Sequence, residues 1–148
     1  MILRAFLPMV LAAVLAGCTS EPVDFAVEPT VRDGAVELVG STSLVDTSRV
    51  SCEVWHESED EGLGPGDFMD LAWSEVQDGR FNCEVDVSGW PAGTIRASVT
   101  FEPYEPDQPA VVVETYGTSG QRLAGPLVTH SSDGAMLQIL LDLPTTNP

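Results

Sequence analysis

The feature that most constrains the fold is a two-residue alternation of apolar and polar side chains, which recurs along most of the chain. It is clearest over residues 81–88, where a polar residue follows each of the apolar residues Phe81, Cys83, Val85 and Val87. Successive side chains of a β-strand point to opposite faces, so this pattern predicts a strand with one buried face. No long segment has helical periodicity. The chain is therefore predicted to be all-β.

The alternation predicts about seven to nine short antiparallel strands. They are expected within residues 25–31, 35–39, 49–56, 71–76, 81–87, 95–101, 110–116, 127–129 and 135–143. Asp-Gly pairs at 33–34, 78–79 and 133–134 predict tight turns. Segment 110–116 is apolar on both faces and is predicted to be a central strand. Strands at intervals of about 8–12 residues favour a β-sandwich.

The first 18 residues are predicted to form an export signal, because Arg4 is their only charge and residues 5–16 are apolar. That run is shorter than the about 20 residues that a membrane-spanning helix needs. It ends in Leu15-Ala16-Gly17-Cys18, which resembles the lipobox of bacterial lipoproteins. The alternative is an ordinary secretory signal that happens to contain a cysteine.

The lipobox resemblance implies that residues 1–17 are removed and that Cys18 becomes the lipidated first residue. Residues 18–23 would then be a short tether. The protein is accordingly expected on the extracytoplasmic side of the cell membrane or the outer membrane, held there by lipid.

The other two cysteines are predicted to form a disulfide. Cys52 and Cys83 fall on the apolar faces of their strands, so their sulfurs can meet in the core, across one sheet or between two. Outside the cytoplasm such thiols usually pair. Closing a loop of about 32 residues stabilises a fold by roughly 3–4 kcal/mol in the chain-entropy model. Metal binding is the weaker alternative, since no CxxC or neighbouring His accompanies the pair.

Three short motifs resemble those of immunoglobulin-like domains in secreted bacterial proteins. They are residues 36–44 (Val-Glu-Leu-Val-Gly-Ser-Thr-Ser-Leu), Gly79-Arg80-Phe81 and residues 91–95 (Pro-Ala-Gly-Thr-Ile). The resemblance implies a single immunoglobulin-like, Greek-key β-sandwich over residues 24–143, followed by a flexible tail at 144–148. Two departures from the antibody pattern are expected. Cys52 and Cys83 are too close in sequence for its inter-sheet bridge, and Trp55 lies on the face opposite Cys52.

The charge balance narrows the range of partners. The chain has 23 acidic and 6 basic residues, no lysine, and a net charge of −17. Such a surface repels nucleic acid and anionic lipid headgroups. The charge is interpreted as a means of solubility, or as adaptation to a salty or divalent-rich habitat. An acidic docking face is the alternative.

The sequence offers little for catalysis, and the protein is predicted not to be an enzyme. Its two histidines, His56 and His130, belong to no metal-binding or hydrolase motif. His56 is interpreted as a hydrogen-bonded histidine at the end of a strand. The alternative is an envelope hydrolase with a dispersed site, in which His56 or His130 lies in a pocket beside a serine and a carboxylate.

Residues 57–70 form the most unusual loop, with six carboxylates and three glycines. Carboxylates of this number can bind Ca²⁺, but the spacing does not match a known calcium loop, and a solvated acidic loop is the favoured interpretation. No other cofactor is predicted.

The function predicted from these features is a non-catalytic binding module of the cell envelope. Its partner would be an envelope protein or a glycan. The alternative is a structural or accessory subunit, which a large exposed apolar patch would favour. Trp73 and Trp90 are expected in the core or at its rim. The candidate binding surface consists of Trp55, Tyr104, Asp60, Glu61, Asp67 and Asp70.

Overall fold

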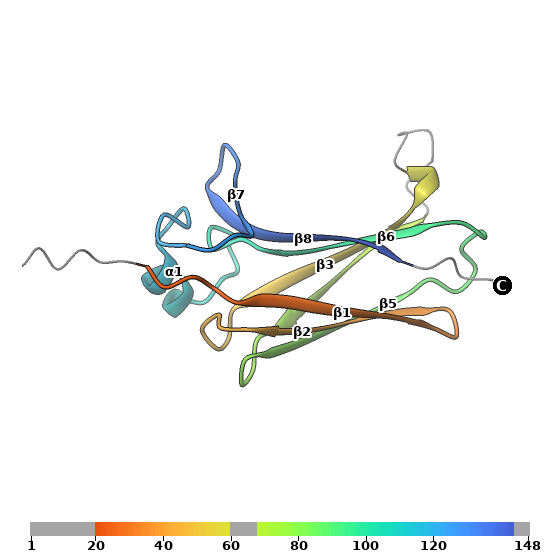
Figure 1. Ribbon diagram of the computed structural model, residues 1–148, viewed down its shortest axis with the longest axis horizontal. Coiled ribbons are helices and arrows are strands. Elements are labelled where there is room, and N and C mark those ends of the chain that lie inside the picture. The colour runs from red at the N-terminus through yellow and green to blue at the C-terminus, as the bar shows by residue number, and fades with distance from the viewer. Residues whose placement is uncertain (1–19, 60–67, 144–148) are drawn as a thin grey trace, which may run out of the picture.

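The protein is a sandwich of two antiparallel sheets (Figure 1), seen here in a computed structural model that describes residues 20–59 and 68–143. The three-stranded sheet has the order β1-β2-β5, with bounds Phe25–Arg32, Ala35–Thr42 and Arg80–Asp86. The five-stranded sheet has the order β4-β3-β6-β8-β7, with bounds Met69–Glu75, Arg49–His56, Ile95–Phe101, Ala135–Leu143 and Val128–His130. This is the predicted immunoglobulin-like, Greek-key arrangement.

Two of the predicted Asp-Gly turns have the backbone that a tight turn requires. Asp33 and Gly34 have φ angles of 45° and 80° and connect β1 to β2. Asp78 and Gly79 have φ angles of 50° and 70° and connect β4 to β5. Positive φ at both central positions matches the right-handed twist of the flanking strands. The turn between β4 and β5 also carries the chain from one sheet to the other.

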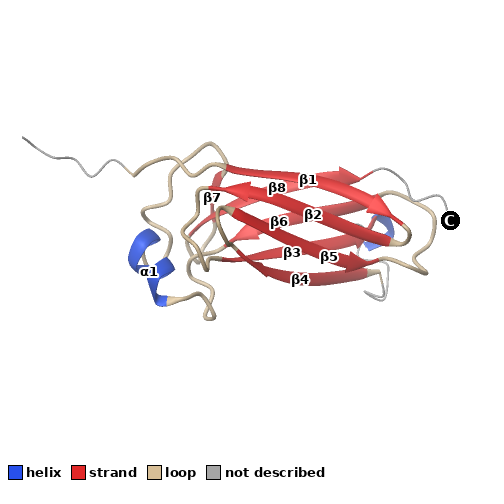
Figure 2. Cartoon of the chain, turned by 90° about the horizontal axis from the view of Figure 1, so that it is seen from below, coloured by secondary structure: helices blue, strands red, loops and turns tan. Residues whose placement is uncertain are grey.

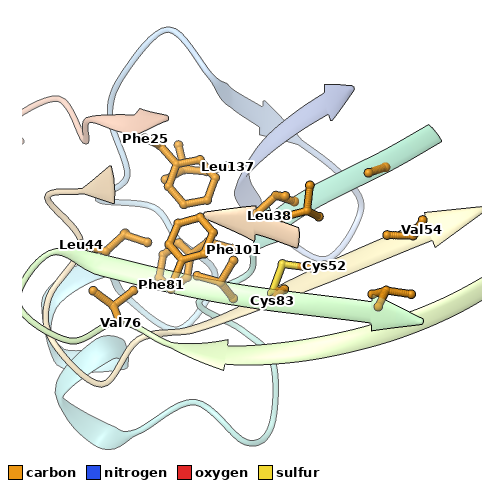
Figure 3. Close-up of a cluster of buried hydrophobic side chains, with 14 of the residues drawn as sticks. Phe25, Leu38, Leu44, Cys52, Val54, Val76, Phe81, Cys83, Phe101 and Leu137 are labelled. Carbon is orange, nitrogen blue, oxygen red and sulfur yellow. A yellow bond between two sulfur atoms is a disulfide. The ribbon is translucent and has the colours of Figure 1, made fainter. Parts of the chain in front are cut away.

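The core fills the space between the sheets, and the predicted disulfide crosses it (Figure 3). Cys52 of β3 and Cys83 of β5 lie 6.3 Å apart at Cα, and their strands belong to different sheets. The expectation that these cysteines are too close in sequence for an inter-sheet bridge is therefore wrong. Because the chain changes sheets after β4, only one strand separates the two cysteines along the sequence.

Segment 110–116 is a helix, α1 (Ala110–Tyr116), and the prediction of a central strand there is wrong. Its buried residues are Val112 and Tyr116, one helical turn apart, while Val111 is exposed. A short apolar run fits a buried strand or a buried helix equally well, so the sequence pattern alone does not distinguish them. The Tyr116 ring meets Phe101 edge-on at 5.4 Å, and its hydroxyl accepts a hydrogen bond of 2.9 Å from Val45 N–H.

The folded domain begins one residue earlier than predicted. Val23, expected in the tether, is buried in the core, and its N–H donates to the Ala124 carbonyl at 2.8 Å. Figures 1 and 2 show this N-terminal segment and α1 at one end of the sandwich. The short 3₁₀ helix η1 (Glu57–Glu59) lies at the other end.

Candidate functional site: the outer face of the five-stranded sheet

The most unusual surface of the molecule is the side of the five-stranded sheet that faces away from the core. β4 pairs with β3 in a register that places Ala72 opposite the buried Cys52. Because side chains alternate, the neighbouring residues Met69, Leu71 and Trp73 must point outward. They are 46%, 49% and 42% exposed. An isolated antiparallel sheet normally carries polar side chains on its solvent face.

The same exposed surface continues across the sheet to β8. Strand register aligns Leu71 with Glu53, Ser98 and Leu140 in one row across four strands. Leu140 is 67% exposed, the largest value among the large hydrophobic residues of the described chain. The next row joins Met69 to Trp55, which is half-buried. We define the apolar face by its large side chains, which are Trp55, Met69, Leu71, Trp73 and Leu140.

Polar residues separate the large apolar ones. Ser51 and the buried Thr100 lie in the row of Trp73, and Glu53 and the buried Ser98 lie between Leu71 and Leu140. The surface therefore combines apolar side chains with the carboxylate of Glu53 and the half-buried hydroxyl of Ser51. This mixture is typical of non-obligate recognition surfaces rather than of a permanently buried interface.

Two arginines border the apolar face. The Arg49 guanidinium lies 5.1 Å from the Trp73 ring centroid and 3.2 Å from the Asp107 carboxylate. Arg96 forms an ion pair of 3.2 Å with Asp142. Exposed ion pairs contribute little to stability, but a cation over an indole restrains the ring. Trp73 is thus held in place although it is solvent-exposed.

Two open hollows flank this surface. One of about 310 Å³ is bordered by Trp55, Arg96, Leu140 and Asp142. The other, of about 550 Å³, lies where β4 meets the three-stranded sheet, and Trp73 and Val39 are among its lining residues. Both hollows combine apolar side chains with charged groups. They offer places for a partner's side chains or for a sugar ring.

Of the predicted binding residues, Trp55 belongs to the apolar face, and its predicted outward orientation is confirmed. Asp70 is exposed at the start of β4, where its Oδ1 accepts the Leu71 N–H at 2.8 Å. Asp60, Glu61 and Asp67 lie outside the described residues, as does Cys18. The expectation that Trp73 packs in the core or at its rim is wrong, whereas Trp90 is half-buried and packs against the core.

Tyr104 is half-buried and lies in the loop between β6 and α1, not on the apolar face. Its hydroxyl donates to Glu102 Oε1 at 3.1 Å and lies 3.4 Å from Ser131 Oγ. Burial raises the pKa of Tyr104, and the negative charge of Glu102 raises it further. These contacts give Tyr104 a structural role, and it is not joined to the other predicted binding residues.

His56 is buried, as its predicted position on the face of Cys52 requires. Its Nδ1 accepts a hydrogen bond from Ser58 N–H at 3.1 Å and lies 2.9 Å from Ser58 Oγ. Its Nε2 has no hydrogen-bond partner among the described residues and lies against Gly93. The neighbouring Glu57 bonds instead to Thr94, and this lowers the pKa of the Glu57 carboxyl. The Ser58–His56 contact is a local turn to which no carboxylate is hydrogen-bonded in the described part of the chain.

His130 borders a hollow of about 510 Å³ together with Ser131, Ser132 and Asp133. The Ser131 hydroxyl bonds to Gly134 and Tyr104 rather than to the imidazole. A nucleophile and its base need a mutual hydrogen bond, and His130 makes none with a serine or a carboxylate among the described residues.

Sequence reasoning missed Met69, Leu71, Trp73 and Leu140. The sequence did contain a signal for Leu140. Along β8 the alternate residues Gln138 and Asp142 are polar and point outward, so Leu140 between them must also point outward. β4 had none, since its large residues alternate with small ones and either set is compatible with a core.

Within residues 20–59 and 68–143, no three His, Cys, Asp or Glu side chains gather closely enough to hold a metal ion. No helix in that part of the chain is long and apolar enough to span a membrane. No protein-family model matches the sequence, and no curated protein matches it.

Proposed function

We propose that this protein is a lipid-anchored, non-catalytic binding module of a bacterial cell envelope, which engages an envelope protein or glycan through the apolar face. The observation that carries the proposal is the group of exposed large side chains on the outer side of the five-stranded sheet. Several large exposed apolar side chains on one face mark interaction sites on soluble domains.

The anchor part of the proposal depends on the lipobox-like Leu15-Ala16-Gly17-Cys18. Because Val23 is fixed in the core, only residues 19–22 separate the lipidated cysteine from the domain. Four extended residues span at most about 14 Å. The end of the sandwich that carries α1 therefore sits beside the membrane, and the strands extend away from it. The apolar face is then accessible from the side.

The anchor is tested by labelling cells with a palmitate analogue and partitioning the extract in a phase-separating detergent. The wild-type chain should be labelled and enter the detergent phase. Cys18→Ala should lose both properties. Equal labelling of the variant, or a wild-type chain that stays in the aqueous phase, contradicts the anchor.

The binding part is tested by placing a photo-crosslinking amino acid on each side of the sandwich in living cells. Positions 71 and 140 lie on the apolar face, and positions 37 and 84 lie on the outer side of the three-stranded sheet. We expect a specific crosslinked product from positions 71 and 140 alone. Crosslinks of equal yield from both pairs of positions, or from neither, contradict the assignment.

A structural or accessory subunit is the second candidate, and the same apolar face favours it. The difference lies in permanence, because an obligate interface is more apolar than this surface and is never exposed. A partner that co-purifies in fixed stoichiometry through high salt and dilution would identify a subunit. A complex that dissociates and re-forms would identify a binding module.

A further inference from the structure

Strand β4 forms one edge of the five-stranded sheet, and this open edge differs from the other sheet edges in the described chain. Natural edge strands are protected by prolines, charges or shortness. β1, at an edge of the three-stranded sheet, contains Pro29 between Glu28 and Thr30. β7, at the opposite edge of the five-stranded sheet, has only three residues. Near the Asp78-Gly79 turn the edges of β4 and β5 face each other, since Asn82 N–H donates to Ser74 Oγ at 3.1 Å, and the edge of β4 is open over Met69–Trp73. β4 has no proline and carries three exposed large apolar residues.

The pairing of β4 with β3 determines which backbone groups lie at this edge. His56 N–H donates to the Phe68 carbonyl at 2.9 Å, and Val76 N–H donates to the Ser48 carbonyl at 2.8 Å. Bonded and non-bonded residues alternate along an antiparallel pair, so the even-numbered residues of β4 point their backbone groups toward β3. Those of the odd-numbered residues point to the open edge. Asp70 accepts one of these donors, the Leu71 N–H.

The same odd-numbered residues carry the apolar side chains. Trp73 therefore offers backbone hydrogen-bonding groups at the edge and an exposed indole on the outer face. The adjoining hollow of about 550 Å³ runs from Trp73 and Glu75 to Val39 and Arg80. It provides space beside the edge for side chains of an added strand.

We propose that β4 binds an extended segment of a partner polypeptide, which adds to the five-stranded sheet as a sixth, antiparallel strand. This inference rests on the proposed function and specifies its partner. Alternate residues of the segment would be apolar, to lie beside Leu71 and Trp73. The others would be basic, because they lie on the side of Asp70 and the whole chain has a net charge of −17.

A second copy of this chain fits the edge less well. Antiparallel addition of β4 to another β4 reverses the long axis of the second molecule. Its N-terminal end would then lie away from the membrane, beyond the reach of a tether of residues 19–22. Two chains of this charge also repel each other.

The test uses the lipidated full-length protein in nanodiscs and a short fluorescent peptide that alternates valine and lysine. Binding is followed by fluorescence anisotropy. With valines beside Leu71 and Trp73, the valine N–H groups face β4 and the lysine N–H groups face solvent. N-methylation of the central valines should weaken binding about tenfold or more, because it removes donors that strand addition uses. N-methylation of the central lysines should leave binding unchanged.

Matched variants separate the edge from the opposite face. Leu71→Ser should weaken peptide binding about tenfold, whereas Ala26→Ser, on the outer face of the three-stranded sheet, should not change it, because β1 lies away from the open edge. A peptide with glutamate in place of lysine should not bind. The N-methylated peptides leave the protein unaltered, so their result is independent of any folding defect in the variants.

Three outcomes overturn strand addition. They are no binding of the valine–lysine peptide, equal binding of both N-methylated peptides, and equal weakening by Leu71→Ser and Ala26→Ser. A dimer in analytical ultracentrifugation that Leu71→Ser dissociates would also overturn it, in favour of a second copy. The photo-crosslinks from positions 71 and 140 would survive the second and third outcomes, so failure of this inference is distinguishable from failure of the proposed function.

Discussion

The two outer faces of the sandwich carry different kinds of side chain. The face of the three-stranded sheet carries Glu28, Glu37, Glu84 and Asp86, and its single exposed large hydrophobic residue in the described chain is Val39. The face of the five-stranded sheet carries Met69, Leu71, Trp73 and Leu140. Both sheets contribute similar apolar side chains to the core. The difference therefore concerns what each sheet meets outside, and not how the domain folds.

The outer face of the three-stranded sheet is not optimised for stability alone. Register places Glu37 directly opposite Glu84, and like charges in such cross-strand pairs are destabilising. The Asn82 side-chain amide, which donates to Glu37 Oε1 at 3.4 Å, relieves only part of this repulsion. We interpret the three-stranded face as the solvated side of the domain and the apolar face as its recognition side.

The largest effect is expected from removing the disulfide, which tests whether the two sheets share one core. Replacing both Cys52 and Cys83 by Ala should lower the free energy of unfolding by roughly 3–4 kcal/mol, because the unfolded chain loses its cross-link. Urea denaturation with and without reductant measures the change. If both sheets depend on the same core, the variant still unfolds in one transition. Two separate transitions, one for each sheet, would break the comparison.

A smaller loss is expected where one glycine makes room for an aromatic ring. Gly40 of β2 lies under Phe81, and a methyl group there would overlap that ring. Gly40→Ala should reduce the free energy of unfolding by about 1–3 kcal/mol through overpacking. Ser41→Ala, on the outer side of the same strand, is the matched control and should change it by less than about 0.5 kcal/mol. Equal stability of the two variants in urea denaturation would contradict the packing described for Phe81.

Changes on the outer faces should have little effect on stability but unequal effects on binding. Leu71→Ser and Ala26→Ser each make an exposed apolar side chain polar, and each should alter the free energy of unfolding by less than about 0.5 kcal/mol. In the crosslinking assay from position 140, Leu71→Ser should reduce the yield and Ala26→Ser, on the outer face of the three-stranded sheet, should not. If Ala26→Ser reduced it as strongly, the distinction between the faces would be lost.

The smallest effect is expected in the titration of the two tyrosines, which lie on neither face. Burial raises the pKa of Tyr104 and of Tyr116 above the ordinary value of 10.0. Since the folded state favours the neutral phenols, their contribution is complete below about pH 10 and is lost as the pH rises through the raised pKa values. In a pH titration, the absorbance of tyrosinate should appear at a higher pH than for free tyrosine. The Leu71→Ser variant should give the same titration curve. Ionisation at the ordinary pH would contradict the described burial.

Much of the fold could be predicted from alternation, and the reason is visible in particular strands. Residues 81–87 and 95–101 have one apolar and one polar set, so their buried face is unambiguous. Segment 110–116 has no polar set, and tertiary packing at the end of the sandwich decides for a helix. The disulfide followed from parity, but its course between the sheets depends on where the chain changes layer.

The apolar face could be predicted only in part. Trp55 was placed correctly, because its parity is opposite to that of Cys52. Trp73 was not, because size favours a buried tryptophan over Ala72 and Ser74, and only the register with β3 reverses that choice. The outward side chains of β4 depart from the usual rule that the solvent face of an antiparallel sheet is polar, so a prediction based on that rule fails there.

If the apolar face is a recognition surface, it is covered in the cell and exposed in the isolated protein. Oxidative footprinting measures this directly, because Met69 and Trp73 both react readily with hydroxyl radicals and lie on that face. In the purified protein both residues should be oxidised. In intact envelopes they should be protected, while Arg32 on the opposite face reacts equally in both samples. Equal oxidation of Met69 and Trp73 in envelopes and in the purified protein would contradict the account.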